Sequence, residues 1–176
     1  YLKGQKIIYM ESKYYCSQQL NMLMLPAIFL SSIASVLSEV IQCKEDYNFI
    51  LCGEGPLKAE SERILSYCKN VQFTGQISEI ELAKIIGKAQ LVISPALSDS
   101  IPLTILEAVA SGTPVVASDI AANQHWVDEK LPVYIFDKDD SNDLAEKILE
   151  IVNSQTILEG ALENGPKLVK EKYSFE

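Results

Sequence analysis

The 176-residue sequence predicts one α/β domain, a doubly wound parallel sheet of about six strands with helices on both faces. Strand and helix signals alternate along the chain. The strand signals are short apolar runs rather than strict apolar–polar alternations, which is typical of strands covered on both faces. The predicted strands are Lys6–Met10, Tyr47–Cys52, Val71–Gly75, Gln90–Pro95, Pro114–Ser118 and Pro132–Phe136.

The first predicted helix, Leu20–Gln42, is apolar enough to be compared with a membrane span. Its part Leu20–Ile41 carries no charge before Glu39, and a span needs about 20 apolar residues. Asn21, Pro26 and four serines interrupt the segment. We therefore expect a helix packed in the layered fold.

The later helices are predicted from spacing and end signals. Apolar residues at helical spacing indicate a helix over Leu57–Cys68. Ser78 followed by Glu81 is a capping-box pattern, and Gly112 is a suitable C-terminal glycine. The other predicted helices are Ile101–Gly112, Ser141–Ser154 with Ser141 or Asn142 as its cap, and a tail helix from Ile157, broken or kinked near Gly165–Pro166.

Composition excludes several function classes. A net charge of −9 argues against nucleic-acid binding, which needs a basic surface. Four cysteines without a C-x-x-C pair and a single histidine, His125, argue against a zinc site. We expect free thiols in a reducing compartment, with Cys52 as a small core residue. His125 beside Trp126 is expected to be a surface or packing residue.

The loops after the strands are where a doubly wound sheet binds ligands. Asp99 follows a predicted strand, and Glu107 lies about two turns into the helix that this loop opens. The N-terminus of that helix, around Ile101 to Thr104, offers unpaired N–H groups that suit a phosphate. From the residues alone two interpretations stay open: a nucleotide-sugar site, or a turn-forming Asp99 and a solvated Glu107.

Two glycine-containing turns also allow two interpretations each. The turn GEGP contains Gly53 and Gly55, which either turn the chain or let a ligand approach the backbone. The full G-x-G-x-x-G pattern of dinucleotide-binding domains is absent there. Gly75 is either a plain turn or the floor beneath a base. The segment SGTP, which contains Gly112, is expected to be structural.

Taken together, the segments FILCGEGPL, VQFTGQIS and LVISPALSDSIPLTILEAVASGTPVVAS resemble the C-terminal half of GT-B glycosyltransferases, in the retaining E-x7-E family (glycosyl transferases group 1). The resemblance covers about residues 47–136. It implies a Rossmann-like domain, one half of a GT-B fold, that spans residues 1–176 and binds a nucleotide-sugar. The acceptor would sit on an N-terminal domain absent from this chain.

The resemblance also implies roles for single residues. Asp99 would face the donor sugar and Lys13 would neutralise the diphosphate, as the catalytic pair. Glu107 would bind the ribose hydroxyls. The remaining donor-binding positions would be Gly53 and Gly55 in the cleft wall, Gly75, Gln76 and Ile77 around the base, and Ile101, Leu103 and Thr104 at the diphosphate. No metal or other cofactor is expected.

Three departures from the family pattern bear on turnover. Asp99 is one methylene shorter than the usual glutamate, and Pro102 removes one N–H from the helix start. Ser12 aligns as well as Lys13 with the usual arginine, and the usual lysine falls on Gln18 or Gln19. A missing cation should weaken stabilisation of the leaving group.

The function implied is a hexosyltransferase-type enzyme that moves a sugar from a nucleotide-sugar to a glycan or lipid-linked acceptor in surface polysaccharide biosynthesis. A UDP- or GDP-linked donor is expected before an ADP-linked one. The fragment alone would be inactive without its N-terminal domain. We expect it in the cytoplasm, at the inner face of the membrane if the absent domain makes peripheral contact. The alternatives are a degenerate, non-catalytic binding or scaffold module, a sugar-nucleotide epimerase and a Rossmann-type oxidoreductase.

Overall fold

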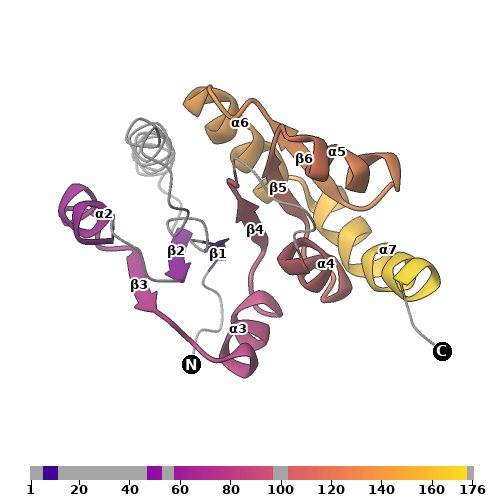
Figure 1. Cartoon of the computed structure of the whole chain (residues 1–176), viewed down its shortest axis with the longest axis horizontal. Coiled ribbons are helices and arrows are strands. Elements are labelled where there is room, and N and C mark those ends of the chain that lie inside the picture. The colour runs from indigo at the N-terminus through magenta and orange to yellow at the C-terminus, as the bar shows by residue number, and fades with distance from the viewer. Residues whose placement is uncertain (1–5, 12–46, 53–57, 97–102, 174–176) are drawn as a thin grey trace.

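A computed structural model describes residues 6–11, 47–52, 58–96 and 103–173. Six parallel strands form one sheet in the order β3-β2-β1-β4-β5-β6 (Figure 1). The strands are β1 (Lys6–Glu11), β2 (Tyr47–Cys52), β3 (Val71–Gly75), β4 (Leu91–Ser94), β5 (Val115–Ser118) and β6 (Val133–Phe136). The doubly wound fold and all six predicted strands are confirmed.

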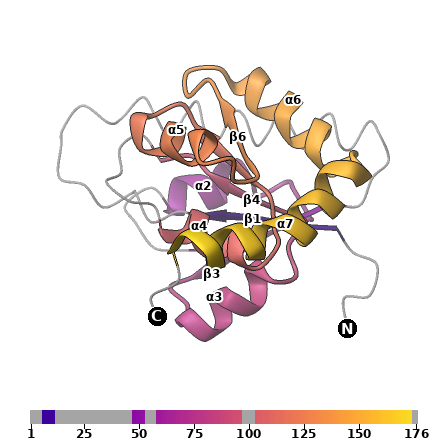
Figure 2. The same cartoon turned by 90° about the vertical axis from the view of Figure 1, so that its right-hand side faces the viewer.

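Helices cover both faces of the sheet. They are α2 (Lys58–Ile64), α3 (Glu79–Ile86), α4 (Leu103–Ala110), α5 (Ala121–Asp128), α6 (Ser141–Val152) and α7 (Gln155–Tyr173). Figure 2 shows the sheet from its edge, with α6 on one side and α3 on the other. The predicted helix Leu20–Gln42 lies outside the described residues, and among those described no helix is long and apolar enough to cross a membrane.

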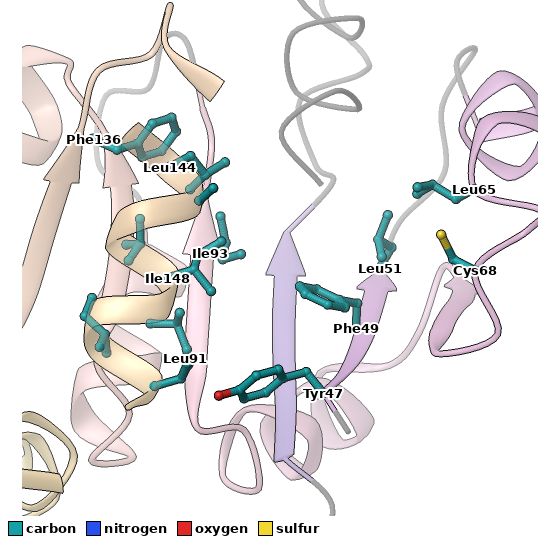
Figure 3. Close-up of a cluster of buried hydrophobic side chains, with 14 residues drawn as sticks. Tyr47, Phe49, Leu51, Leu65, Cys68, Leu91, Ile93, Phe136, Leu144 and Ile148 are labelled. Atoms are coloured by element: carbon teal, nitrogen blue, oxygen red, sulfur yellow. The ribbon is translucent and has the colours of Figure 1, made fainter. Parts of the chain in front are cut away.

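The strand side chains feed two cores, because successive residues point to opposite faces. In β4, Leu91 and Ile93 lie in the core beneath α6, and we call this core the α6-side cluster. Val92 lies in the core on the other face, which also contains Ile105 and Val109 of α4, and we call this core the α4-side cluster. Leu144 and Ile148 of α6 lie against Leu91 and Ile93 in Figure 3. This two-sided burial explains why the strands are continuous apolar runs.

Several predicted helix ends are confirmed. Ser78 Oγ accepts a hydrogen bond from Glu81 N, and Ser78 N donates one to a Glu81 carboxylate oxygen at 3.0 Å, so the capping box forms. Gly112 follows α4 with a φ of +79°, in the left-handed region that favours glycine. The buried Thr113 hydroxyl donates to Ile86 O at 3.1 Å, which supports the structural interpretation of this turn.

Other helix predictions are wrong in part. Helix α2 ends at Ile64 rather than Cys68, because the chain turns there and Cys68 N donates to Leu65 O. The cap of α6 is Asp140, whose Oδ1 accepts from Asn142 N at 2.8 Å. The Asp140 carboxylate, one residue before Ser141 and two before Asn142, thus replaces both predicted caps.

Two helical segments differ more from prediction. Residues Ala121–Asp128 form α5, which is not among the predicted helices. The tail helix is predicted to be broken or kinked near Gly165–Pro166; it is not broken, since α7 is one helix of 19 residues with Pro166 inside it. Its N-terminus is Gln155, two residues before the predicted start.

Candidate functional site at the carboxyl edge of the sheet

The sheet has one point where strand order reverses. β1 pairs with β2 on one side and with β4 on the other, both in parallel register. The next strand in the chain after β1 is β2, on one side, and the next strand after β4 is β5, on the other side. Ligands of doubly wound sheets bind beyond the carboxyl ends of strands at such a point. The carboxyl edge near β1 and β4 is therefore the candidate site.

Helix α4 brings one predicted site residue, Glu107, to an exposed face beside this edge. Its buried residues Thr104, Ile105, Ala108 and Val109 face the protein. Leu103, which is 61% exposed, and Glu107 are four residues apart, so they lie one above the other on the opposite face. Side chains on a helix lean toward its N-terminus. The Glu107 carboxylate therefore leans toward the end of α4 that borders the carboxyl edge.

The N-terminal turn of α4 supplies the other half of this arrangement. The helix begins at Leu103, and its first N–H groups have no carbonyl within the helix to bind. They carry the positive end of the helix dipole, which favours an anion. The Thr104 side chain is only 2% exposed, so a ligand would meet this residue through its backbone rather than its hydroxyl.

The end of β3 forms the opposite part of the edge. Gly75 is buried and has a φ of +68°, which allows the chain to turn out of β3 into α3. The register between β2 and β3 shifts at Leu51/Cys52, so the strand pair carries a bulge at its carboxyl end. Gln76 is exposed there, and Ile77 is half-buried and packs against the α4-side cluster.

Cys52 closes β2 at this edge but is not a nucleophile. Its side chain is buried, and the thiol forms no disulfide. Burial raises the pKa of the Cys52 thiol, and a hydrogen bond with Thr74 opposes that shift only in part. A thiol with a raised pKa stays protonated and unreactive near neutral pH. Cys52 is therefore the small core residue that the sequence predicts, and the free thiols are confirmed for Cys52 and Cys68.

A buried polar cluster after β5 was not predicted. Ser118 Oγ donates to Ala96 O, and Asn123 Nδ2 donates to Ser118 O at 2.9 Å, so the segments after β4 and β5 are joined. Asn123 is fully buried. No sequence signal pointed to it, because the capping and spacing patterns of α5 are weak.

One buried hydroxyl at the edge is unsatisfied. Ser94 ends β4, is 1% exposed, and its Oγ has no hydrogen-bond partner within the described part of the chain. Buried polar groups in native proteins are normally paired with protein or water. By strand alternation Ser94 points to the same face as Val92, toward α4.

The remaining predicted site residues lie outside the described residues. These are Lys13, Gly53, Gly55, Asp99 and Ile101. The structure therefore places Gly75, Gln76, Ile77, Leu103, Thr104 and Glu107. His125 is exposed, as expected, and Trp126 is buried at 4% exposure. Across the described segments, no group of three or more His, Cys, Asp or Glu side chains could hold a metal ion.

The fold and this edge define a doubly wound α/β domain with a helix N-terminus next to an exposed carboxylate. The family model described as "Glycosyl transferases group 1" matches residues 26–154. The chain therefore belongs to the group 1 glycosyltransferases, which confirms the family that the sequence resembles.

Individual relatives agree with this family. An uncharacterized glycosyltransferase of Methanocaldococcus jannaschii is 29% identical over 133 residues, covering 74% of this chain and 38% of the relative. The poly(ribitol-phosphate) alpha-N-acetylglucosaminyltransferase of Staphylococcus aureus is 28% identical over 160 residues, covering 87% of this chain and 31% of the relative. The chain thus spans about a third of the length of these relatives.

A solved structure agrees in fold. A variant of Staphylococcus aureus TarM, crystallised with Fondaparinux, alpha-GlcNAc-glycerol and UDP, superposes with a TM-score of 0.77. The match covers 96% of this chain and 33% of TarM at 22% sequence identity. At that identity the likeness establishes the fold, and this fold is the GT-B half that the sequence predicted.

Proposed function

We propose that this chain is the donor-binding domain of a retaining glycosyltransferase. The enzyme would transfer a sugar from a nucleotide-sugar to a glycan or lipid-linked acceptor in surface polysaccharide biosynthesis. The observation that carries the proposal is helix α4, whose N-terminal turn and exposed Glu107 carboxylate lie together at the carboxyl edge. Membership of the group 1 glycosyltransferases supports it.

In this proposal α4 binds two parts of the donor. The N-terminal N–H groups, beginning at Leu103 and Thr104, would donate hydrogen bonds to the diphosphate, which gains negative charge as the bond to the anomeric carbon breaks. The Glu107 carboxylate would accept hydrogen bonds from the ribose hydroxyls. Gly75, Gln76 and Ile77 would border the base. Asp99 would face the donor sugar and Lys13 the diphosphate.

The reaction itself needs little from this half beyond binding and charge stabilisation. The bond between the anomeric carbon and the diphosphate oxygen would break with its electron pair on the departing nucleoside diphosphate. The acceptor hydroxyl oxygen would bond to the same face of the anomeric carbon, and its proton would pass to the departing diphosphate. We propose that no metal takes part, so that helix N–H groups and Lys13 supply the positive charge. The donor would be UDP- or GDP-linked. The acceptor would bind a separate N-terminal domain, in the cytoplasm at the inner face of the membrane.

Titration calorimetry with UDP, GDP and ADP tests the proposal on the whole protein that contains this chain. We expect UDP or GDP to bind and Glu107→Ala to weaken binding about 10- to 100-fold, because a hydrogen bond to a charged group contributes roughly 1.5–3 kcal/mol. Glu107→Gln should weaken it less, since one acceptor oxygen remains. Glu146→Ala is the matched control, because Glu146 is an exposed glutamate on α6.

Two results would contradict the proposal. The first is that no nucleotide binds at millimolar concentration. The second is that Glu107→Ala and Glu146→Ala bind equally well, which would leave Glu107 as a solvated helix residue. Donor hydrolysis measured on the same samples reports whether the bound nucleotide-sugar is also turned over.

A further inference from the structure

Helix α7 meets α4 backbone against backbone, and two glycines make this approach possible. A Cβ atom added at Gly165 would lie 2.6 Å from the carbonyl oxygen of Val109. Real Cβ atoms do not approach backbone that closely, so any side chain at 165 would push the helices apart. At Gly112, an added Cβ would lie 3.0 Å from Leu162 Cα. The pairs Val109–Gly165 and Gly112–Leu162 therefore fix the position of α7 on α4.

Pro166 fits the same contact. A proline has no N–H, so Leu162 O lacks the bond that residue 166 would donate in a regular helix. The Leu162 carbonyl faces Gly112, where an added Cβ would lie 3.3 Å from its oxygen. The Gly165–Pro166 pair, which looks like a helix break in the sequence, is thus the part of α7 that packs on α4.

The far end of α7 is held on α5. Lys172 Nζ donates to Glu129 O at 2.8 Å and also pairs with the Glu129 carboxylate. The Tyr173 ring meets Trp126 edge-on with ring centres 5.7 Å apart. Figure 1 shows α7 lying along α4 beside α5. A single helix therefore ties together two helices whose N-termini both begin after strands at the carboxyl edge.

The contact with α4 lies next to the residue proposed to bind the donor. Val109 is two residues after Glu107 on the same helix, and it is fully buried between the sheet and α7. A rigid helix transmits a shift at Val109 to its own N-terminal turn, and protein interiors are too closely packed to absorb the shift locally. The packing of α7 on α4 therefore determines the positions of Glu107 and of the first N–H groups of α4.

We propose that Gly165 is a positioning residue for the donor site. Because Gly165 lets α7 pack directly against Val109, it fixes α4 in the position from which Glu107 can bind the nucleotide. The inference rests on the proposed function. It differs from a packing role alone, because it requires that a shift of α7 lowers donor affinity in protein that remains folded.

The test is the affinity for UDP, or for GDP where that is the nucleotide bound, in the whole protein at low temperature. Gly165→Ala should raise Kd about fivefold or more, because small displacements of binding groups have large effects. Gly160→Ala is the matched control: it lies on the same helix, and an added Cβ there meets nothing within 4 Å. It should leave Kd unchanged and keep or raise the melting temperature, since alanine favours helix.

A second control separates positioning from general destabilisation. Ile148 is buried in the α6-side cluster on the other face of the sheet. Ile148→Val or Ile148→Ala, whichever matches the loss of melting temperature in Gly165→Ala, should keep the wild-type Kd. Circular dichroism at the titration temperature confirms that each variant is folded. If Gly165→Ala binds as tightly as the matched Ile148 variant, the inference is overturned.

The remaining outcomes are also decisive. If Gly165→Ala does not fold, Val109→Ala removes side-chain atoms from the same contact without a clash. We expect its Kd to rise about twofold relative to an Ile148 variant of equal stability, in line with weaker preorganisation; an unchanged Kd would refute the inference. If wild type binds nucleotide and Glu107→Ala does not, while Gly165→Ala binds normally, only this inference fails. If wild type binds no nucleotide, the proposed function fails and the inference fails with it.

Discussion

Helices α3 and α5 have eight residues each but are held in place by different means. Helix α3 satisfies its own N-terminus through the capping box of Ser78 and Glu81, and only Ile86 of its residues is buried. Helix α5 has Ile120 at its N-cap position, with no side-chain hydrogen bond there. It is fixed instead by residues that contact the rest of the protein, Asn123 and Trp126.

The difference shows where structural information lies in this chain. The capping box spans four consecutive residues, so it can be recognised in the sequence and formed early in the unfolded chain. Helix α5 depends instead on contacts made elsewhere in the chain: Asn123 with Ser118, Trp126 with Tyr173, and Glu129 at the end of the helix with Lys172. Trp126 and Tyr173 are 47 residues apart in the sequence. Such a helix exists only once the tertiary structure has formed.

Of the substitutions that distinguish α5 from α3, replacing Trp126 should lower the free energy of unfolding most. Trp126 is 4% exposed in the α4-side cluster, and truncation of a buried tryptophan costs about 3–5 kcal/mol. Trp126→Ala should therefore lower the free energy of unfolding by that amount and remove hydrogen-exchange protection from α5 before α3. Urea denaturation followed by far-ultraviolet circular dichroism measures the first effect.

Trp126→Phe provides the control for this substitution. It keeps most of the ring and removes an indole N–H that has no hydrogen-bond partner within the described residues, so its loss should be smaller. Equal exchange rates for α5 and α3 amides in Trp126→Ala would refute the idea that α5 depends on tertiary contacts and α3 on its own cap.

Much of the fold was predictable for the same physical reason. Strands β2 and β3 have the predicted bounds, because their apolar runs are ended by local turn residues such as Gly75. The cap of α6 was misplaced by one residue or two, since several adjacent polar residues could each accept the first N–H groups, and the one that does is Asp140, whose backbone is extended. The alternative of a break at Gly165–Pro166 is wrong, because the sequence cannot show that α4 lies against this pair.

The candidate site was predictable in part. Glu107 and Gly75 are placed by local signals, a helix face and a strand-ending turn, and both lie at the carboxyl edge of the sheet. The buried bonds between Ser118, Asn123 and Ala96 join two strand ends that meet only in the folded sheet. No local pattern encodes such a pairing, so it could not be anticipated.

Removing the cap of α3 should have an intermediate effect. Ser78→Ala deletes the hydroxyl that accepts from Glu81 N, and loss of an N-cap costs about 1 kcal/mol. Urea denaturation should show this loss.

The reciprocal substitution, Ile120→Asp, offers α5 the cap that it lacks. It should gain less than Ser78→Ala loses, because Ile120 is half-buried and its apolar contacts would be given up. If Ile120→Asp lowers the free energy of unfolding, the idea that tertiary contacts hold α5 is also supported. If Ile120→Asp raises the free energy of unfolding by about 1 kcal/mol or more, α5 is limited by its missing cap instead.

The smallest expected effect concerns two carboxylates. Hydrogen bonds from the Ser78 side chain and backbone lower the pKa of Glu81, within α3. A hydrogen bond from Lys172, together with its charge, lowers the pKa of Glu129, at the end of α5 and 43 residues away in sequence. Lys172→Met should return the pKa of Glu129 toward its ordinary value of about 4.3 and leave that of Glu81 lowered. Ser78→Ala should do the reverse.

The sign of the linked stability follows from the direction of these shifts. A carboxylate whose pKa is lower in the folded protein stabilises it above the unfolded pKa, and that contribution is lost as pH falls through the folded pKa. Wild type should therefore exceed Lys172→Met in stability near neutral pH, and the two should converge below the folded pKa of Glu129. The gap should be small and shrink with salt, because both side chains are about one-third exposed. Carbon-detected NMR titration of the two glutamates measures the shifts directly. If Lys172→Met moved the Glu81 pKa as well, α3 would depend on the position of α7, and the division between a locally fixed and a tertiary-fixed helix would fail.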